Sequence, residues 1–422
     1  MGNKSLGQLF MIIFCYVAVI DFNYAQGSSP PVADSGFLHI GVRFLVAGCL
    51  SFIAAAISSA GGIGGGGLFV PILTIVAGLD VKTASSFSAF MVTGGAVANV
   101  ASHIIVRGCG SKIDYDIALL SEPSMLLGVS CGVILNLVLP EWLITGLFVV
   151  FIAFCTFKTF KSGILYWQLE SQVMQEDSQI ENEKPLLEED PEVENHPWMM
   201  KLGMLVVIWV SFFLLYLLRG DRHGRGIIQI EVCGKAYWMI SMMQIPLAVI
   251  FTTWILFHVA TPKDHTSAEQ DNGGLPGIRR SGKLTFPVMA LLAGGLGGVF
   301  GIGGGMLISP LLLQIGIEPE VTAATCSFMV LFSSSMSAIQ YLLLGMQHIR
   351  GALVLSAVCF VASLVGLTLV QRAILKYRRA SLIVFSVGTV MALSTILMTT
   401  FGAIETWRDY TSGQSMGFNK PC

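Results

Sequence analysis

The chain contains, at residues 61–71, the stretch Gly61-Gly62-Ile63-Gly64-Gly65-Gly66-Gly67-Leu68-Phe69-Val70-Pro71. A second copy, at residues 301–310, reads Gly301-Ile302-Gly303-Gly304-Gly305-Met306-Leu307-Ile308-Ser309-Pro310. An offset of 239 residues aligns Gly62 with Gly301 and Pro71 with Pro310. Both copies lie in apolar stretches, where a broken helix leaves backbone N–H groups that lipid cannot satisfy. A duplicated helix-breaking motif of this kind indicates the binding site of a membrane transporter.

The composition is that of a polytopic membrane protein. Of the 422 residues, 54% are hydrophobic and 12% are charged, whereas soluble proteins carry about 25% charged residues. Several apolar windows reach the length of about 20 residues that a spanning helix needs. The net charge of −2 offers no basic surface for nucleic acid, and the nine cysteines lack metal-site spacing. We therefore expect an integral, multi-pass protein surrounded by lipid, without catalytic residues, cofactor, metal or nucleic acid.

The N-terminus resembles a secretory signal peptide. Lys4 precedes an apolar run from Leu9 to Ile20, and a polar segment follows it. The run is too short to span comfortably, so we expect cleavage after Ala25. An uncleaved anchor is the alternative, because Asn23 is not the small residue that the cleavage site prefers. Either form places the protein in the secretory or endomembrane system or the plasma membrane.

The rest of the chain divides into two repeats and an insert. Pieces 68–78 and 306–316 are too short to span and are expected as re-entrant half-helices. With five apolar pieces per repeat and two in the insert, counting each piece as one crossing predicts an all-α protein with inverted repeats. Lysine and arginine placement agrees, except in the loop at 219–235. The predicted divisions are a signal peptide (1–25), a first transmembrane repeat (38–160), an acidic cytoplasmic loop (161–200), an inserted two-helix segment with its linker (201–285), a second repeat (286–402) and a C-terminal tail (403–422).

The acidic loop supports an alternative function. Residues 170–194 contain many acids and one base, Lys184, a pattern typical of a solvated segment. Glu183 to Leu187 resembles an acidic dileucine sorting signal. The chain is therefore, in the alternative, a membrane receptor or trafficking scaffold that acts through this loop.

Charged residues are almost absent from the predicted spans, and Glu122 is read as lying near the start of its segment. An anion at membrane depth would then be held by backbone N–H groups and hydroxyls, and helix N-termini near Leu68 and Met306 supply the former. The predicted substrate-binding residues are glycines of both motifs and hydroxyl residues on the helices that follow them: Gly62, Gly64, Gly65, Gly66, Ser86, Ser88, Gly301, Gly303, Gly304, Gly305, Thr325 and Ser327.

Structural interpretations compete with this site. Gly297, Gly301 and Gly305 have the GxxxG spacing of packed membrane helices, and serine or threonine hydroxyls often bond to carbonyls of their own helix. Asn99 and Gln340 are expected as struts between helices. Matched prolines and hydroxyls in both copies favour a binding site.

Two enzymatic interpretations are weaker. The GxGxxG pattern within the first motif lacks the preceding strand and the following acid of a dinucleotide fold. An intramembrane enzyme would need Asp80 or Asp116, and both lie in predicted loops. The sequence therefore predicts a protein that is not an enzyme.

At the two motifs the sequence resembles the TauE/SafE family of sulfite and organosulfonate exporters. The resemblance is carried by GGIGGGGLFVPIL (61–73) and GIGGGMLISPLLL (301–313), followed by TASSFS (83–88) and TAATCS (322–327). It implies an inverted-repeat secondary transporter that moves sulfite or an organosulfonate by alternating access, with the glycine loops at its central site. The coupling ion, a proton or sodium, and the oligomeric state stay open.

The chain departs from compact members of that family in two respects. Its signal-like N-terminus and its insert at 161–285 resemble the longer eukaryotic, plant-like members. Met306 and Ser309 also stand where the first motif has Gly67 and Val70. These differences make the predicted site asymmetric and leave the choice of anion open.

Overall fold

The computed structural model describes residues 34–62, 65–107, 113–180, 198–219, 234–258, 282–346, 348–377 and 381–412, and within these ranges the chain forms helices and no strand. The predicted signal peptide, Gly64, the loop at 220–233 and residues 413–422 lie outside them. The first repeat comprises α2 (Asp34–Ser58), the 3-10 turn η2 (Ser59–Gly61), α3 (Gly66–Ile75), α4 (Val81–Arg107), α5 (Tyr115–Val138) and α6 (Glu141–Ile180). The insert comprises α7 (Trp198–Arg219), α8 (Lys235–Met242) and α9 (Gln244–His258). The second repeat comprises α10 (Gly282–Phe300), α11 (Gly305–Ile315), α12 (Pro319–Leu343), α13 (Ile349–Tyr377) and α14 (Ser381–Ser412).

Eight candidate membrane spans occur in the part of the chain that the structure describes. They confirm the prediction of an all-α polytopic membrane protein. Helices α3 and α11 have 10 and 11 residues and are too short to cross a bilayer alone. They coincide with the two predicted half-helices. The spans are Val81–Ser102, Tyr115–Val138, Glu141–Gln172, Met200–Leu218, Tyr237–Phe257, Pro319–Leu343, Ile349–Val370 and Ser381–Arg408.

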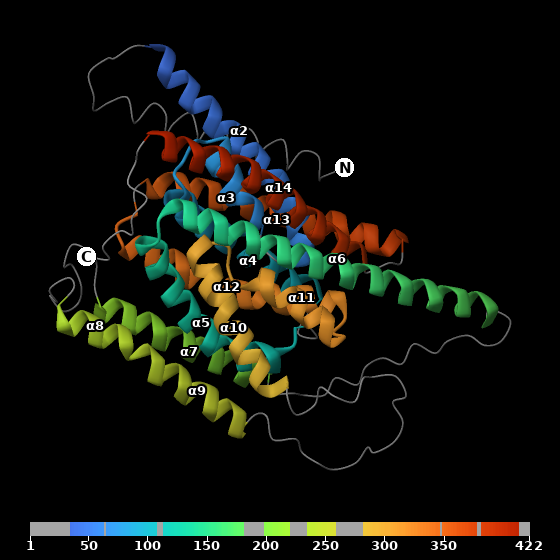
Figure 1. The fold of residues 1–422 in the computed structure, drawn as a ribbon. Helices are drawn as coiled ribbons and strands as arrows, with labels where there is room; N and C mark the ends of the chain where they lie inside the picture. The colour runs from blue at the N-terminus through green and yellow to red at the C-terminus, as the bar shows by residue number, and fades with distance from the viewer. Residues whose placement is uncertain are drawn as a thin grey trace.

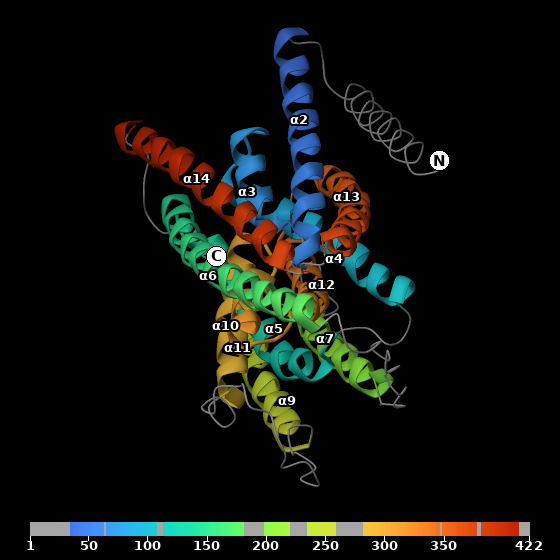
Figure 2. The ribbon, with the colours of Figure 1, turned by 90° about the vertical axis from the view of Figure 1, so that its right-hand side faces the viewer.

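The two repeats interlock (Figures 1 and 2). Helix α5 of the first repeat packs along α10 of the second, and the corresponding helix α13 packs along α2. Helices α4 and α12 correspond in the two repeats, and so do α3 and α11, and α6 and α14. The contact between α4 and α13 is accordingly matched by one between α12 and α5, and the contact between α14 and α3 by one between α6 and α11. Each repeat therefore buries its apolar faces mainly against the other one.

Helices α5 and α10, which make the most extensive contact between two helices in the described structure, pack through glycines. A side chain at Gly294 would overlap the carbonyl of Met125, and one at Gly132 would overlap the carbonyl of Gly295. Gly128 and Gly298 are equally confined by backbone of the facing helix. Small residues at this spacing let membrane helices approach backbone to backbone. GxxxG packing thus occurs at Gly294 and Gly298, whereas the GxxxG spacing noted in the sequence was that of Gly297, Gly301 and Gly305.

The insert covers one flank of this pair. Helices α7 and α9 contact α5 and form an outer layer (Figure 1). Side chains on their outer faces remain open, with Val207 58%, Ile250 62% and Phe257 76% exposed. Such apolar faces are suited to lipid contact. The second helix predicted in the insert is interrupted after α8, where Pro246 has no N–H to donate to the carbonyl four residues earlier.

Two helices extend beyond the predicted boundaries. Helix α6 does not end near residue 160 but continues to Ile180, so residues 161–180 are helical and the predicted loop is shorter. The Glu170 carboxylate accepts hydrogen bonds from the backbone N–H (2.9 Å) and hydroxyl (2.5 Å) of Ser381. This contact ties the extension to the start of α14. Helix α14 in turn runs to Ser412, into the predicted tail.

Candidate functional site

Both glycine motifs interrupt the helices at left-handed backbone positions. Gly62 and Gly65 have φ of 70° and 83°, and Gly301 and Gly303 have φ of 64° and 68°. Glycine adopts such angles without the steric penalty of other residues. Each motif therefore ends one helix and starts a short one, α3 or α11. We call these two interruptions the glycine breaks: residues 62, 65 and 66 in the first motif and residues 301–305 in the second.

The two glycine breaks contact each other in the buried centre of the protein. A side chain at Gly66 would lie 2.7 Å from the Cα of Ile302, and one at Gly305 would lie 3.7 Å from the carbonyl oxygen of Gly62. Gly65 and Gly304 occupy the N-cap positions of α3 and α11, and neither helix has a side-chain cap. The first-turn N–H groups of two helices are therefore close together, and such groups need partners from outside their helix.

Each break also packs on a long helix of the opposite repeat. Gly62 lies against the start of α12, where an added side chain would overlap the Ala323 carbonyl and approach the Ser327 hydroxyl to 2.9 Å. Gly301 lies against the start of α4, where it would overlap the carbonyl of Ser85. The arrangement is reciprocal, and only glycine fits at either position.

A polar cluster lies beside the first break. The Ser59 hydroxyl donates to the Asn99 side-chain oxygen at 2.5 Å, and the Asn99 amide donates to Ser327 at 3.5 Å. The Ser327 hydroxyl also donates to the Ala323 carbonyl at 2.9 Å. Asn99 thus links η2 to α12, in the strut position that the sequence predicts. Ser327 is the predicted hydroxyl that the fold brings to Gly62.

The other predicted hydroxyls are engaged elsewhere or lack partners. Ser86 donates to the carbonyls of Lys82 and Thr83 in its own helix, both at 3.0 Å. The Thr325 hydroxyl oxygen accepts the backbone N–H of Asp114 at 2.9 Å. Ser88 is buried without a hydrogen-bond partner among the described residues. These three hydroxyls therefore do not join Ser327 in the cluster beside Gly62.

The remaining predicted glycines face different neighbours. A side chain at Gly303 would contact Val330 and Val92 and lie 3.6 Å from the Cβ of Ser334. One at Gly304 would lie 2.7 Å from the Met125 sulfur on α5. The second break therefore touches α4, α5 and α12, whereas Gly64 of the first lies outside the described residues.

Sequence reasoning missed Ser394, which supports the first half-helix. Pro71 lacks the N–H that would otherwise bond to the carbonyl of Gly67, four residues earlier. The Ser394 hydroxyl donates to that carbonyl instead. A proline inside a short helix signals a freed carbonyl, but the sequence does not show which distant hydroxyl reaches it.

A small pocket adjoins the breaks. It has a volume of about 10 Å³, close to the space that one water molecule needs, and lies between α6, α11, α12 and α14. Hydroxyl residues Thr159, Ser309 and Thr322 share its lining with Gly61, next to the first break. Ser309 is the residue at which the second motif differs from Val70 of the first. One of the two sequence differences between the motifs thus falls in this pocket.

Glu122, predicted near the start of its apolar segment, is a buried acid. Its side chain is 0% exposed within the span Tyr115–Val138. Neither carboxylate oxygen has a hydrogen-bond partner in the described structure.

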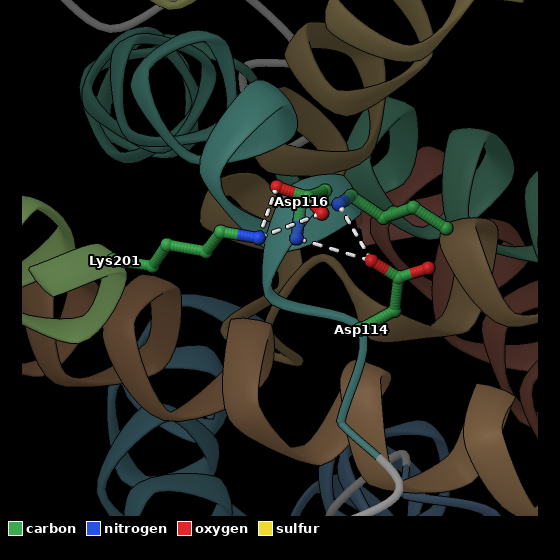
Figure 3. Close-up of polar contacts among 4 residues, drawn as sticks. Asp114, Asp116 and Lys201 are labelled. Atoms are coloured by element: carbon green, nitrogen blue, oxygen red, sulfur yellow. Dashed lines mark hydrogen bonds and ion pairs between the residues drawn. The ribbon is translucent and has the colours of Figure 1, made fainter. Parts of the chain in front are cut away.

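The two aspartates considered for enzyme chemistry lie at helix starts. Asp80 accepts a hydrogen bond from the backbone N–H of Thr83 at 2.9 Å. Asp116 forms an ion pair with Lys201 at 2.8 Å (Figure 3).

These features define a multi-pass membrane protein whose centre is built from two duplicated helix breaks. The chain belongs to the sulfite exporter TauE/SafE family, whose family model matches residues 3–159, 47–223 and 196–398. It is therefore a membrane transporter of the sulfite exporter type and not an enzyme.

Curated relatives from Arabidopsis thaliana extend over most of the chain. Sulfite exporter TauE/SafE family protein 2 is 60% identical over 406 residues, which cover 90% of this chain and 87% of that protein. Family protein 5 is 52% identical and covers 99% of this chain and 100% of its own length. Family protein 1 is 56% identical, with coverage of 91% and 89%. No solved structure matches the chain.

Proposed function

We propose that this protein moves a small sulfur oxyanion, sulfite or an organosulfonate, by alternating access and binds it between the two glycine breaks. The observation that carries the proposal is the meeting of the α3 and α11 N-termini without side-chain caps. A helix N-terminus carries about half a positive charge, and its free N–H groups suit oxyanions. The names of the curated relatives supply the substrate class.

The pocket beside Gly61 is the proposed approach to this site. Its hydroxyls, from Thr159, Ser309 and Thr322, would replace part of the hydration shell of an incoming anion. Between the breaks themselves there is no room, because a single added carbon at Gly66 would lie 2.7 Å from Ile302. The breaks must therefore separate before an anion enters. Alternating access would then be a movement of α3 relative to α11.

The reciprocal packing supports inverted repeats as the basis of this movement. The α5–α10 pair corresponds to the α13–α2 pair, as a pseudo-two-fold axis between the repeats requires. Transporters with inverted repeats bind substrate at the repeat interface and expose it by rocking one part against another. The scaffold alternative rests on the acidic segment 170–194, of which residues 181–194 lie outside the described residues.

The test is uptake of radiolabelled sulfite into proteoliposomes that contain the purified protein, with sulfate and taurine as competitors. We expect saturable uptake by the wild type. Gly66→Ala should abolish it, because the new methyl group would force α3 away from Ile302. Gly146→Ala on α6 is the matched control, since nothing lies within 4 Å of its added carbon. Competition then ranks the anions.

Two results would contradict the proposal in different ways. Wild-type uptake in the Gly66→Ala protein would show that the breaks are not the binding site. A folded wild type that moves none of these anions under any ion gradient would exclude the substrate class.

A further inference from the structure

Glu122 is a buried carboxyl group that the proposed anion site does not use. It lies on α5, with its side chain 0% exposed. Its two oxygen atoms have no hydrogen-bond partner among the residues that the structure describes. A helix that buries an acid in this way departs from the strong rule that buried charges are paired. Inside a membrane span, an ionisable residue is most often part of an ion or proton pathway.

No described cation compensates this carboxyl group. On α5 itself, Asp114 caps the helix by accepting the N–H groups of Asp116 (3.0 Å) and Ile117 (3.1 Å) (Figure 3). Lys201 on α7 is already paired with Asp116 at 2.8 Å. Helix α12 contributes two acids near its start, Glu318 and Glu320. The described side chains of α9 (244–257) and α10 (286–300) include no acid or base.

The protonated form of Glu122 is therefore the form that fits this closed arrangement. An ionised carboxylate without partners in an apolar interior is far more costly than the neutral acid, and such groups neutralise instead. Water would have to reach α5 before the proton could leave. Pro123 leaves the Leu119 carbonyl without its helix hydrogen bond, because proline has no N–H. This carbonyl is a site at which water could reach α5.

The position of Glu122 connects it to the second glycine break. Met125 lies three residues along α5, about one helical turn away. The sulfur of Met125 lies 2.7 Å from where a side chain at Gly304 would begin. Met125 therefore packs on the N-cap of α11 and lies one helical turn from Glu122. A change in charge or hydration at Glu122 would thus occur close to the second glycine break.

We propose that Glu122 carries the proton that couples anion movement to a proton gradient, an inference that rests on the proposed function. In the closed state the carboxyl is neutral. While the breaks are separated towards one side, the carboxylate takes a proton from water there. The protein then closes around the neutral acid. When the breaks separate towards the other side and water reaches α5, the O–H bond breaks and the proton passes to water, leaving the carboxylate. No other bond changes, and the proton is the only species that Glu122 transfers.

The test compares wild type and Glu122→Gln in proteoliposomes loaded with a pH-sensitive dye. Glutamine has the shape of the neutral acid but holds no transferable proton. We expect the variant to keep sulfite exchange without a gradient but to lose both accumulation driven by a pH gradient and the proton movement that accompanies sulfite. Asp116→Asn, at the exposed start of the same helix, is the control and should keep all three activities.

The possible outcomes separate the two proposals. Sulfite-linked proton movement at the wild-type level in Glu122→Gln would overturn the role of Glu122. Wild-type sulfite flux without any proton movement would overturn it too and leave the proposed function standing. Absence of all anion flux in the wild type would refute both.

A second measurement does not depend on recovery of the variant. A lipid-soluble carbodiimide reacts with protonated carboxyl groups in apolar surroundings, so it can be applied to the wild type. We expect modification of Glu122, detected by peptide mass spectrometry, to advance in step with loss of proton-coupled flux. An unmodified Glu122, or full coupling after its modification, would refute the proposal.

Discussion

Replacement of Gly62 by alanine tests whether the first glycine break depends on close approach to α12. Gly62 has φ of 70° and lies against the carbonyl of Ala323. Two penalties follow, one from the left-handed backbone and one from the overlap. The first is about 1–2 kcal/mol for a residue with a side chain. Overpacking adds about 1–3 kcal/mol, so we expect Gly62→Ala to lose about 2–5 kcal/mol of stability together with transport.

The chain provides a control that separates these penalties. Gly78, in the turn after α3, has nearly the same φ, 73°, but nothing lies within 4 Å of its added carbon. Gly78→Ala should therefore cost only the backbone penalty of about 1–2 kcal/mol and keep transport. Gly301→Ala, at the corresponding position of the second motif, has φ of 64° and would overlap the Ser85 carbonyl. It should behave like Gly62→Ala.

The assay pairs denaturant unfolding in mixed micelles with sulfite uptake at equal amounts of reconstituted protein. The informative quantity is the difference in unfolding free energy between Gly62→Ala and Gly78→Ala. Equal losses for the two variants, with uptake retained in both, would refute the close approach of the break to α12.

Two further predictions concern single contacts. Ser394→Ala should lower the unfolding free energy by about 1–3 kcal/mol, because it leaves the Gly67 carbonyl unpaired, and Pro71→Ala in the same protein should recover part of the loss by restoring the helix N–H. A double variant no more stable than Ser394→Ala alone would contradict this account. The Lys201–Asp116 pair, with its aspartate side chain 58% exposed, should show a coupling energy of about 0.2–1 kcal/mol in a double-mutant cycle. That coupling should weaken as salt rises, and a larger, salt-independent value would indicate a buried interaction instead.

The helical architecture of this protein could be predicted from its sequence. Apolar runs and the two glycine motifs predicted the spans and the short pieces found as α3 (Gly66–Ile75) and α11 (Gly305–Ile315). These features are local, since helix length and helix breaking depend on neighbouring residues. The end of α6 was missed because the contact that ties its extension to α14, between Glu170 and Ser381, joins residues far apart in the sequence.

Side-chain directions at the candidate site were less predictable. A serine in a helix can always bond to a carbonyl of the preceding turn, and Ser86 does so. Ser327 does the same, yet it also reaches Asn99, because α12 happens to face α4. Glu122 was predicted near the start of an apolar segment, with no indication of its burial. Its burial depends on what packs around α5, and one sequence does not reveal that packing.

The interlocked repeats have a consequence for synthesis. Helix α5 ends at Val138, but its partner α10 begins at Gly282. At about 5–20 residues per second, the ribosome needs on the order of 10 s to make the intervening chain. During that interval the glycine face of α5, at Gly128 and Gly132, has no helix to receive it. Biogenesis therefore includes a waiting period in which a half-made protein depends on lipid or on insertion factors to protect this glycine face.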